Sequence, residues 1–513
     1  MTARGRERPQ RVRQLRNAVQ QAGAGAPYAV LAWIGLLWTL GNCAYVYLLG
    51  HSDHAYRIES SLWILTAVLL PVLLRTSGVR RAPVLTLHDT QVTLTIMTVV
   101  WAALYVPVIR LPFLSDDYVF LQWSQSSGRL LHASEFFRPA FATIFLVLSR
   151  LSRSPMLFHG VNLALHLGNA LLAYALATRI FSARGPAALV FTVVLLNPAQ
   201  LEAVLWVSGL QELLWTFFVL AGLWLYTRPP LELSSVRLAG VAGCTILALL
   251  SKETAICCVL LFPFADFLLG RWARPSTLRA YATFAVIVAG YLVLHAAFAH
   301  GDPRYWVWPS RYFVKEFLSR PYAVFGHPWN ASAVAVPAIL RFTLTVTLVT
   351  LLFAAVMRRR VGRRLLIGPM VILFSTAPLY GYFYVGPDLI ASRYVYFAAI
   401  GWGLLVAELI AGVTERRSTY LLGLVLTAGC CAASLDFNMR PWRAAGTLVD
   451  AMRAAIVHGD DLDRTILVWR QTHPGTLEMR GGVPYEYDGV GIFINGYAEF
   501  RQQMLTGTDR APR

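Results

Sequence analysis

Residues 91–118 read QVTLTIMTVVWAALYVPVIRLPFLSDDY. In this stretch an apolar run is followed, after a short connection, by two adjacent acidic residues. Residues 91–109 are apolar enough and long enough to cross a hydrocarbon core, which takes about 20 residues of helix. Asp116 and Asp117 then stand side by side near the end of that span. Two adjacent carboxylates at a membrane surface cost desolvation and mutual repulsion. Such a pair indicates either an ion, proton or substrate site or a solvated loop.

The composition is that of a membrane protein. Of the 513 residues, 57% are hydrophobic and only 14% are charged. Several apolar runs reach the length of a membrane span. The first run begins near residue 28 and continues too far for the apolar segment of a cleavable signal peptide. We therefore expect an all-α polytopic membrane protein without a cleaved signal.

The positions of the arginines predict the orientation in the membrane. The net charge of +18 could suit a nucleic-acid-binding protein. The arginines, however, cluster in every second loop, which is typical of cytoplasmic loops, so we expect no nucleic-acid partner. The predicted spans, about thirteen in number, are 28–50, 60–74, 91–109, 156–178, 186–198, 209–226, 236–250, 253–269, 279–298, 335–357, 365–385, 394–412 and 418–436. The arginines of the tail 1–27 and of the alternate loops place the N-terminus in the cytoplasm and the acidic pair on the outer face. Because the number of spans is odd, the C-terminus also lies on the outer face.

Four segments follow from this reading. They are a basic cytoplasmic tail at 1–27, two N-terminal spans within 28–90, a transmembrane domain at 91–436 and a small α/β appendage at 437–513 on the outer face. In the appendage we expect a helix at 441–457, a strand at 466–469 and a Gly-rich stretch at 481–496. Two segments, 141–148 and 312–318, are too short to span and are predicted to lie along the interface.

One predicted span carries a polar stripe. His159, Asn162, His166 and Asn169 recur at spacings that place them on one face of a helix. Inside a membrane such a stripe must face partner helices or a polar cavity. Hydrogen bonding between helices accounts for it. Alternatively, His159, which is nearest the outer end, reaches a substrate site.

Separate outer loops each carry charged residues. Apart from the acidic pair, these are Arg138, Glu202, Lys252, Glu253 and Arg393. Cations beside carboxylates at one membrane face suit a reaction on an anionic lipid headgroup, because cations can bind a phosphate and a carboxylate can act as a general base. The same residues could instead form interfacial ion pairs. The chain has no P-loop, CxxC or HExxH motif, and its six cysteines lie in apolar runs without the spacing of metal ligands.

In this order, the motifs resemble those of the GT-C membrane glycosyltransferases that use polyprenyl-phosphate sugars, and in particular the protein O-mannosyltransferases. The matching stretches are Ser115-Asp116-Asp117-Tyr118, Phe137-Arg138-Pro139, Phe158-His159 with Asn162, His166 and Asn169, Asn197-Pro198 with Glu202-Ala203-Val204 and Trp206, Leu250-Ser251-Lys252-Glu253-Thr254, and Ser392-Arg393-Tyr394-Val395-Tyr396. The resemblance covers roughly residues 91–412.

The resemblance implies a GT-C-like bundle of about eleven core spans, with the two N-terminal spans outside it. It also implies an inverting transfer from a polyprenyl-phosphate-linked sugar to a glycan, lipid or protein acceptor. By position, Asp116 and Asp117 would be catalytic, and the pair could hold a divalent cation or act without one. The residues expected to contact substrate are Arg138, His159, Glu202, Lys252, Glu253, Arg393 and Tyr394.

Two other functions fit parts of the pattern. An envelope polysaccharide polymerase or ligase that uses lipid-diphosphate glycans would also place basic residues on the outer face. A transporter or flippase would need charges at mid-membrane, whereas here the charges lie at the ends of the spans. The bias toward arginine over lysine suggests a bacterial inner membrane.

Overall fold

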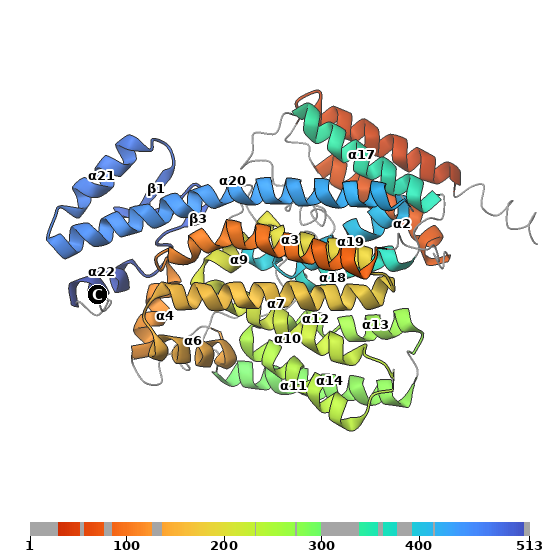
Figure 1. Ribbon diagram of the computed structural model, residues 1–513, viewed down its shortest axis with the longest axis horizontal. Coiled ribbons are helices and arrows are strands. Elements are labelled where there is room, and N and C mark those ends of the chain that lie inside the picture. Colours follow the sequence, from red (N-terminus) through yellow and green to blue (C-terminus); the bar gives the residue numbers. More distant parts are fainter. Residues whose placement is uncertain are drawn as a thin grey trace, which may run out of the picture. The chain divides into compact units, whose positions relative to one another are not determined.

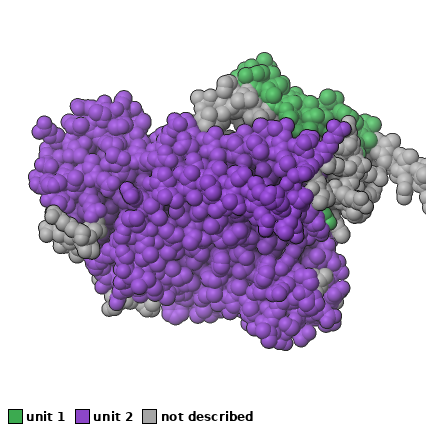
Figure 2. Space-filling model, viewed as in Figure 1, with its two compact units in different colours: residues 1–80, 336–365 green, residues 81–335, 366–513 purple. Residues whose placement is uncertain are grey.

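The computed structural model describes residues 29–51, 56–75, 85–125, 136–230, 232–271, 274–298, 338–357, 363–376, 392–413 and 416–506. The tail 1–27 and the predicted interfacial helix at 312–318 lie outside these ranges. The described chain is mostly helical, with one small sheet. It forms two compact units, shown in Figure 2: residues 1–80 with 336–365, and residues 81–335 with 366–513.

The first unit contains the two N-terminal helices and a third helix from much later in the chain. These are Ala29–Tyr47, α2 (Tyr56–Arg75) and α17 (Ala338–Met357). The side chains of Cys43, Val46 and Ile58 are buried together, and Phe342 and Val346 of α17 pack against them. The span expected at 335–357 therefore groups with the N-terminal spans rather than with the rest of 91–436.

The second unit contains the remaining helices and the sheet (Figure 1). Its helices are α3 (Leu87–Tyr105), α4 (Asp116–Gln125), α6 (Pro139–Leu151), α7 (Pro155–Phe181), α8 (Arg184–Leu196), α9 (Leu201–Leu205), α10 (Leu210–Tyr226), α11 (Ser235–Ser251), α12 (Ala255–Cys258), α13 (Leu261–Leu269), α14 (Pro275–Phe298), α18 (Ile367–Thr376), α19 (Ala398–Val413), α20 (Arg417–His458), α21 (Leu462–Thr472) and α22 (Tyr497–Thr506). Short 3-10 turns are η2 (Val106–Arg110), η3 (Pro198–Gln200), η4 (Val207–Gly209) and η9 (Ser392–Val395).

Several of these helices could cross a membrane. Among the described residues, six helices are long and apolar enough, and a seventh span is formed if α8 and the bent segment Pro198–Leu205 count as one. That pair bends by 52° at the break between them. The chain is thus helical with several candidate spans, as expected for a multi-pass membrane protein. The described count is lower than the predicted thirteen, because several apolar runs form shorter helices, such as α11 and the broken pair α12–α13.

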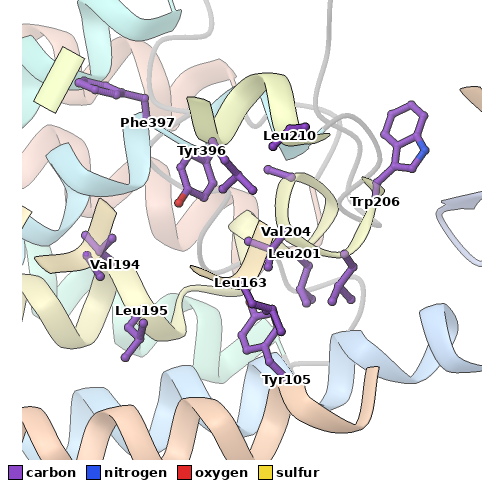
Figure 3. Packing of buried hydrophobic residues seen from close by; sticks show 14 of the residues in the cluster. Tyr105, Leu163, Val194, Leu195, Leu201, Val204, Trp206, Leu210, Tyr396 and Phe397 are labelled. Atoms are coloured by element: carbon purple, nitrogen blue, oxygen red, sulfur yellow. The ribbon is translucent and has the colours of Figure 1, made fainter. Parts of the chain in front are cut away.

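The centre of the second unit is α8. Every residue from Gly185 to Leu196 is buried, as expected for a helix that is apolar all round. Helices α3, α7, α19 and α20 surround it. Figure 3 shows the core where α7, α9 and the chain around η9 meet, with Leu163, Leu201, Val204 and Tyr396 among the packed side chains.

Two glycines let α18 and α19 approach each other closely. A Cβ atom built at Gly368 would lie 2.5 Å from the carbonyl oxygen of Gly401, and a Cβ at Gly401 would lie 2.5 Å from the carbonyl oxygen of Gly368. Small residues at helix crossings are common in membrane proteins, because they let the backbones touch.

The last part of the chain differs in two ways from the sequence prediction. The predicted helix at 441–457 is the end of α20, a single helix of 42 residues that also includes the last predicted span. The strand predicted at 466–469 is wrong, because these residues lie in α21. The side chain of Asp461 caps that helix by accepting from the amides of Asp463 and Arg464, so the local sequence favours a helix.

The appendage does contain a small sheet, which lies later in the chain than the predicted strand and overlaps the Gly-rich stretch expected at 481–496. It consists of β1 (Leu477–Arg480), β2 (Val483–Tyr487) and β3 (Val490–Gly491), paired antiparallel in that order. Gly481 and Gly482, both with positive φ, form the turn between β1 and β2. Figure 1 shows α21, the sheet and α22 gathered at one end of α20.

The α18–α19 contact yields a prediction. In G401A the new methyl group meets the backbone of Gly368 and Ile372, so the substitution should destabilise the protein by about 1–3 kcal/mol. Thermal unfolding in detergent measures the loss. The control is G429A in α20, where a Cβ meets nothing within 4 Å and a helical alanine is favourable. Equal melting temperatures for G401A and G429A would contradict the close contact.

Candidate functional site

The acidic pair begins helix α4 and follows a tightly held turn. Acidic residues in the first turn of a helix are stabilised by its N-terminal backbone dipole. Two residues of the turn, Leu111 and Leu114, have carbonyl groups that accept side-chain hydrogen bonds. The Nε2 atom of His159 lies 3.1 Å from the oxygen of Leu111, and the indole of Trp206 donates to Leu114 over 3.1 Å.

Asp117 is buried and fully engaged. One carboxylate oxygen accepts from the Leu114 amide at 2.9 Å, and the other accepts from the amide of Ser208 at 2.8 Å and from the Ser208 hydroxyl. Burial raises the pKa of Asp117 to about 7, although these hydrogen bonds pull it down. The side chain thus connects the acidic turn to η4 and offers no oxygen to a substrate.

Asp116 differs from its neighbour. Its side chain is partly exposed, and its Oδ1 atom accepts a hydrogen bond of 2.7 Å from the side-chain amide of Asn495. Of the residues that the structure describes, none donates to Oδ2 of Asp116. The adjacent acids therefore have different roles in the structure, and only Asp116 has a carboxylate oxygen available to a ligand.

Three cations predicted from the sequence each face a carboxylate. Arg138 at the start of α6 donates from Nε to Glu253 at 2.7 Å and from a terminal nitrogen to Gln211 at 2.6 Å. Burial opposes the ionisation of Glu253, but the nearby Arg138 outweighs it and lowers the pKa of Glu253 to about 2. Lys252 pairs with Glu212, and both side chains are almost completely buried.

The third cation is Arg393, which joins η9 to α9. Its guanidinium pairs with Glu202, and its backbone amide donates to the same carboxylate at 2.9 Å. The guanidinium also lies over the indole of Trp206, 4.6 Å from the ring centroid. Burial opposes the charge of Arg393, but Glu202 and, among weaker contributors, Asp116 raise its pKa. Trp206 also links Arg393 to the acidic turn, because its ring lies under the guanidinium and its indole donates to the carbonyl of Leu114.

Tyr394 connects these pairs into one cluster. Arg393 and Lys252 each lie 4.6 Å from the centroid of its ring, and Arg393 donates to its hydroxyl at 3.1 Å. The charges of Arg138, Glu202 and Glu212 also act on this hydroxyl. Charged residues from loops far apart in the sequence thus meet at one place, as the sequence analysis expected.

The polar stripe on α7 hydrogen-bonds to neighbouring segments along its length. Asn162 donates to the carbonyl of Trp206 at 3.0 Å, and Asn169 donates to the carbonyl of Leu213 at 3.1 Å. His166 contacts the Tyr396 hydroxyl at 2.9 Å and the carbonyl of Leu195 at 3.2 Å. These contacts match the first of the two readings of the stripe. His159 supports the start of the acidic turn from a buried position.

Several residues of the site were not singled out from the sequence. Glu212 neutralises Lys252, and Gln211 accepts a hydrogen bond from Arg138. Ser208 donates to Asp117. Glu212 carried a signal, because an acid inside the apolar run 209–226 is expensive unless it has a partner. Asn495 carried none, since nothing in the sequence connects it with Asp116.

A comparison with known protein families and with curated protein sequences finds no match for this chain. Within the described ranges, no group of three or more His, Cys, Asp or Glu side chains is arranged to hold a metal ion.

The raised pKa of Asp117 makes stability pH-dependent. Its folded pKa of about 7 lies above its ordinary value of 3.8, so the native state binds more protons than the unfolded state between these values. The stability from this group is complete below the lower pKa and is lost as the pH rises through the higher one. D117N does not titrate. The melting temperature of the wild type minus that of D117N should therefore fall as the pH rises from about 4 to about 7 and then level off. A constant or rising difference would argue against a protonated Asp117.

The buried Lys252–Glu212 pair predicts strong coupling. K252M leaves the Glu212 carboxylate without its cation and should cost about 3–5 kcal/mol, because an unpaired buried charge is not compensated. E212Q should likewise be costly. The double variant K252M/E212Q removes both charges and should recover much of the loss. Thermal unfolding of the four proteins gives the coupling energy. Additive effects of the two single substitutions would show that the pair is not coupled.

Proposed function

We propose that the protein is a membrane glycosyltransferase that transfers a sugar from a polyprenyl-phosphate donor to an acceptor on the outer face of a bacterial inner membrane. The observation that carries this proposal is the available Oδ2 of Asp116 beside the Arg393–Tyr394–Lys252 cluster. The order of the motifs in the sequence supports the same assignment.

In this proposal Asp116 is the general base. An acceptor hydroxyl gives its proton to Oδ2 of Asp116, while its oxygen forms a bond to the anomeric carbon of the sugar. The bond between that carbon and the donor phosphate oxygen breaks, and the polyprenyl phosphate leaves with the electron pair. Attack and departure occur on opposite faces of the carbon, so its configuration inverts. Such proton transfer contributes about 10²–10⁴-fold to a rate.

Arg393 is the best candidate to bind the departing phosphate. A guanidinium has five N–H donors, and the side-chain contacts of Arg393 with described residues use two nitrogens, one on Glu202 and one on Tyr394. Its side chain keeps 17% of its surface exposed, whereas that of Lys252 keeps 2%. We therefore assign phosphate binding to Arg393 and a supporting role, through Glu212 and Tyr394, to Lys252.

Two other ligand sites are less favourable, namely a divalent cation held by the acidic pair and a donor phosphate in the cavity beside α4. Both carboxylate oxygens of Asp117 already accept hydrogen bonds, so a divalent cation shared with Asp116 would have to displace them. A cavity of about 210 Å³ between α4, α6 and α22 contains Arg150 and Arg153. Its lining on α4 begins at Leu121 and ends at Gln125, about 8 Å to about 14 Å along the helix from Asp116. The cavity thus begins more than one helical turn beyond Asp116, whereas Arg393 is near enough for the charge of Asp116 to raise its pKa.

The role of Asp116 is tested by D116N, which keeps the shape of the side chain and removes its basicity. Transfer should fall by about 10²–10⁴-fold, and the melting temperature should stay near that of the wild type because Asp116 is partly exposed. The readout is mass spectrometry of envelope glycans, glycolipids and glycoproteins from cells with wild-type protein, with D116N or with neither.

The matched control is D460N, an exposed aspartate just after α20, which should behave as wild type. Identical glycans in cells with and without the protein would overturn the proposed function. Normal glycans in cells with D116N would keep the function but remove Asp116 as its base.

A further inference from the structure

The turn that carries Asp116 has an unusual backbone conformation. Ser115 has a φ of 49°, in the left-handed region that residues other than glycine adopt rarely. Its amide donates to the carbonyl of Ile492 at 2.8 Å, and its hydroxyl accepts from the amide of Asn495 at 3.3 Å. Both partners belong to the C-terminal appendage. The conformation next to the acidic pair is therefore held by residues almost 400 positions later in the chain.

Close backbone contact continues at the next position. Gly496 has a φ of 82°, and a Cβ atom there would overlap the carbonyl oxygen of Ser115. Glycine alone combines this φ with the absence of a side chain. The segment 492–496 thus fits closely against the acidic turn.

Aromatic side chains also pack between α4 and the appendage. The ring of Tyr118 lies 5.1 Å from that of Phe500 and 6.2 Å from that of Phe493. All three side chains are buried. The side-chain amide of Gln503 also donates to the carbonyl of Tyr118 at 3.1 Å. The appendage therefore docks on the first turn of α4 through buried aromatic side chains that are continuous with the core of the second unit, and α22 supplies one of them.

We propose that the C-terminal appendage completes the active site and that Asn495 is a positioning residue for Asp116. This inference rests on the proposed function. The amide of Asn495 binds Oδ1 of Asp116 and leaves Oδ2 directed to the acceptor. The side chain acts only through the carboxylate and does not contact the reacting atoms.

The test uses three variants of the full-length protein and two measurements. Transfer gives kcat and KM, and hydrogen–deuterium exchange of the peptide containing residues 114–118 reports whether the appendage is docked. N495A removes the contact with Oδ1 but keeps the backbone contact of Ser115 with Ile492. Exchange protection should therefore remain, while kcat falls by between about 10-fold and about 10²-fold with KM nearly unchanged.

N495D separates positioning from simple support. It sets a second carboxylate against Asp116, and two carboxylates so close cannot both ionise at little cost. The acidic limb of the pH–rate profile should then move to higher pH, which a merely structural residue would not cause. Q502A removes the contact of Gln502 with Gln122 on the same docking surface and should match the wild type in both measurements.

The possible results distinguish failure of the positioning role of Asn495 from failure of the proposed function. If the wild type transfers sugar and N495A does so with unchanged kcat, the positioning role is overturned and the proposed function stands. If N495D shows the same pH profile as N495A, the same conclusion follows. If the wild type transfers no sugar, the proposed function fails and this role for Asn495 fails with it. Lost exchange protection in N495A would assign Asn495 to docking and overturn positioning.

Discussion

Three cations inside an apolar bundle each face their own carboxylate, and this pairing holds the candidate site together. Removing a charge from water costs several kcal/mol unless an opposite charge and hydrogen bonds compensate. Arg138, Lys252 and Arg393 therefore bring with them Glu253, Glu212 and Glu202 from other segments. The result is a site that is close to neutral when empty, in which the arginines still have N–H donors for an anionic ligand.

A second set of contacts positions the segments that carry these charges. The chain between α8 and α10 is broken into short turns, and its carbonyl groups need partners because unsatisfied backbone groups are costly in a membrane. Asn162 on α7 supplies a partner at Trp206, and Asn169 donates to the carbonyl of Leu213 near the start of α10. The polar stripe thus supports the irregular backbone from which Ser208 reaches Asp117. Helix α7 therefore both supports this backbone and helps to set the geometry of the candidate site.

Much of this could be predicted from the sequence. Lone charges at the ends of apolar runs have few ways to be satisfied, so their convergence followed from their residue types and order. The sequence could not predict that Asp117 is buried and hydrogen-bonded while Asp116 is partly exposed, because adjacent residues of the same type differ only in what surrounds them. Glu212 was overlooked although its place in an apolar run required a partner. The strand expected at 466–469 was wrong because the capping side chain of Asp461 favours a helix there.

The sequence by itself determined that the chain is helical and apolar enough to cross a membrane several times, and that most of the charges of the candidate site lie near the ends of apolar runs. Length, composition and periodicity carry that information, because each acts within a single segment. The tertiary structure alone decided which charges pair, which of two neighbouring acids keeps a free oxygen, and that the C-terminal appendage holds Asp116. These outcomes depend on contacts between residues hundreds of positions apart, such as Asn495 and Asp116, and no local pattern records them.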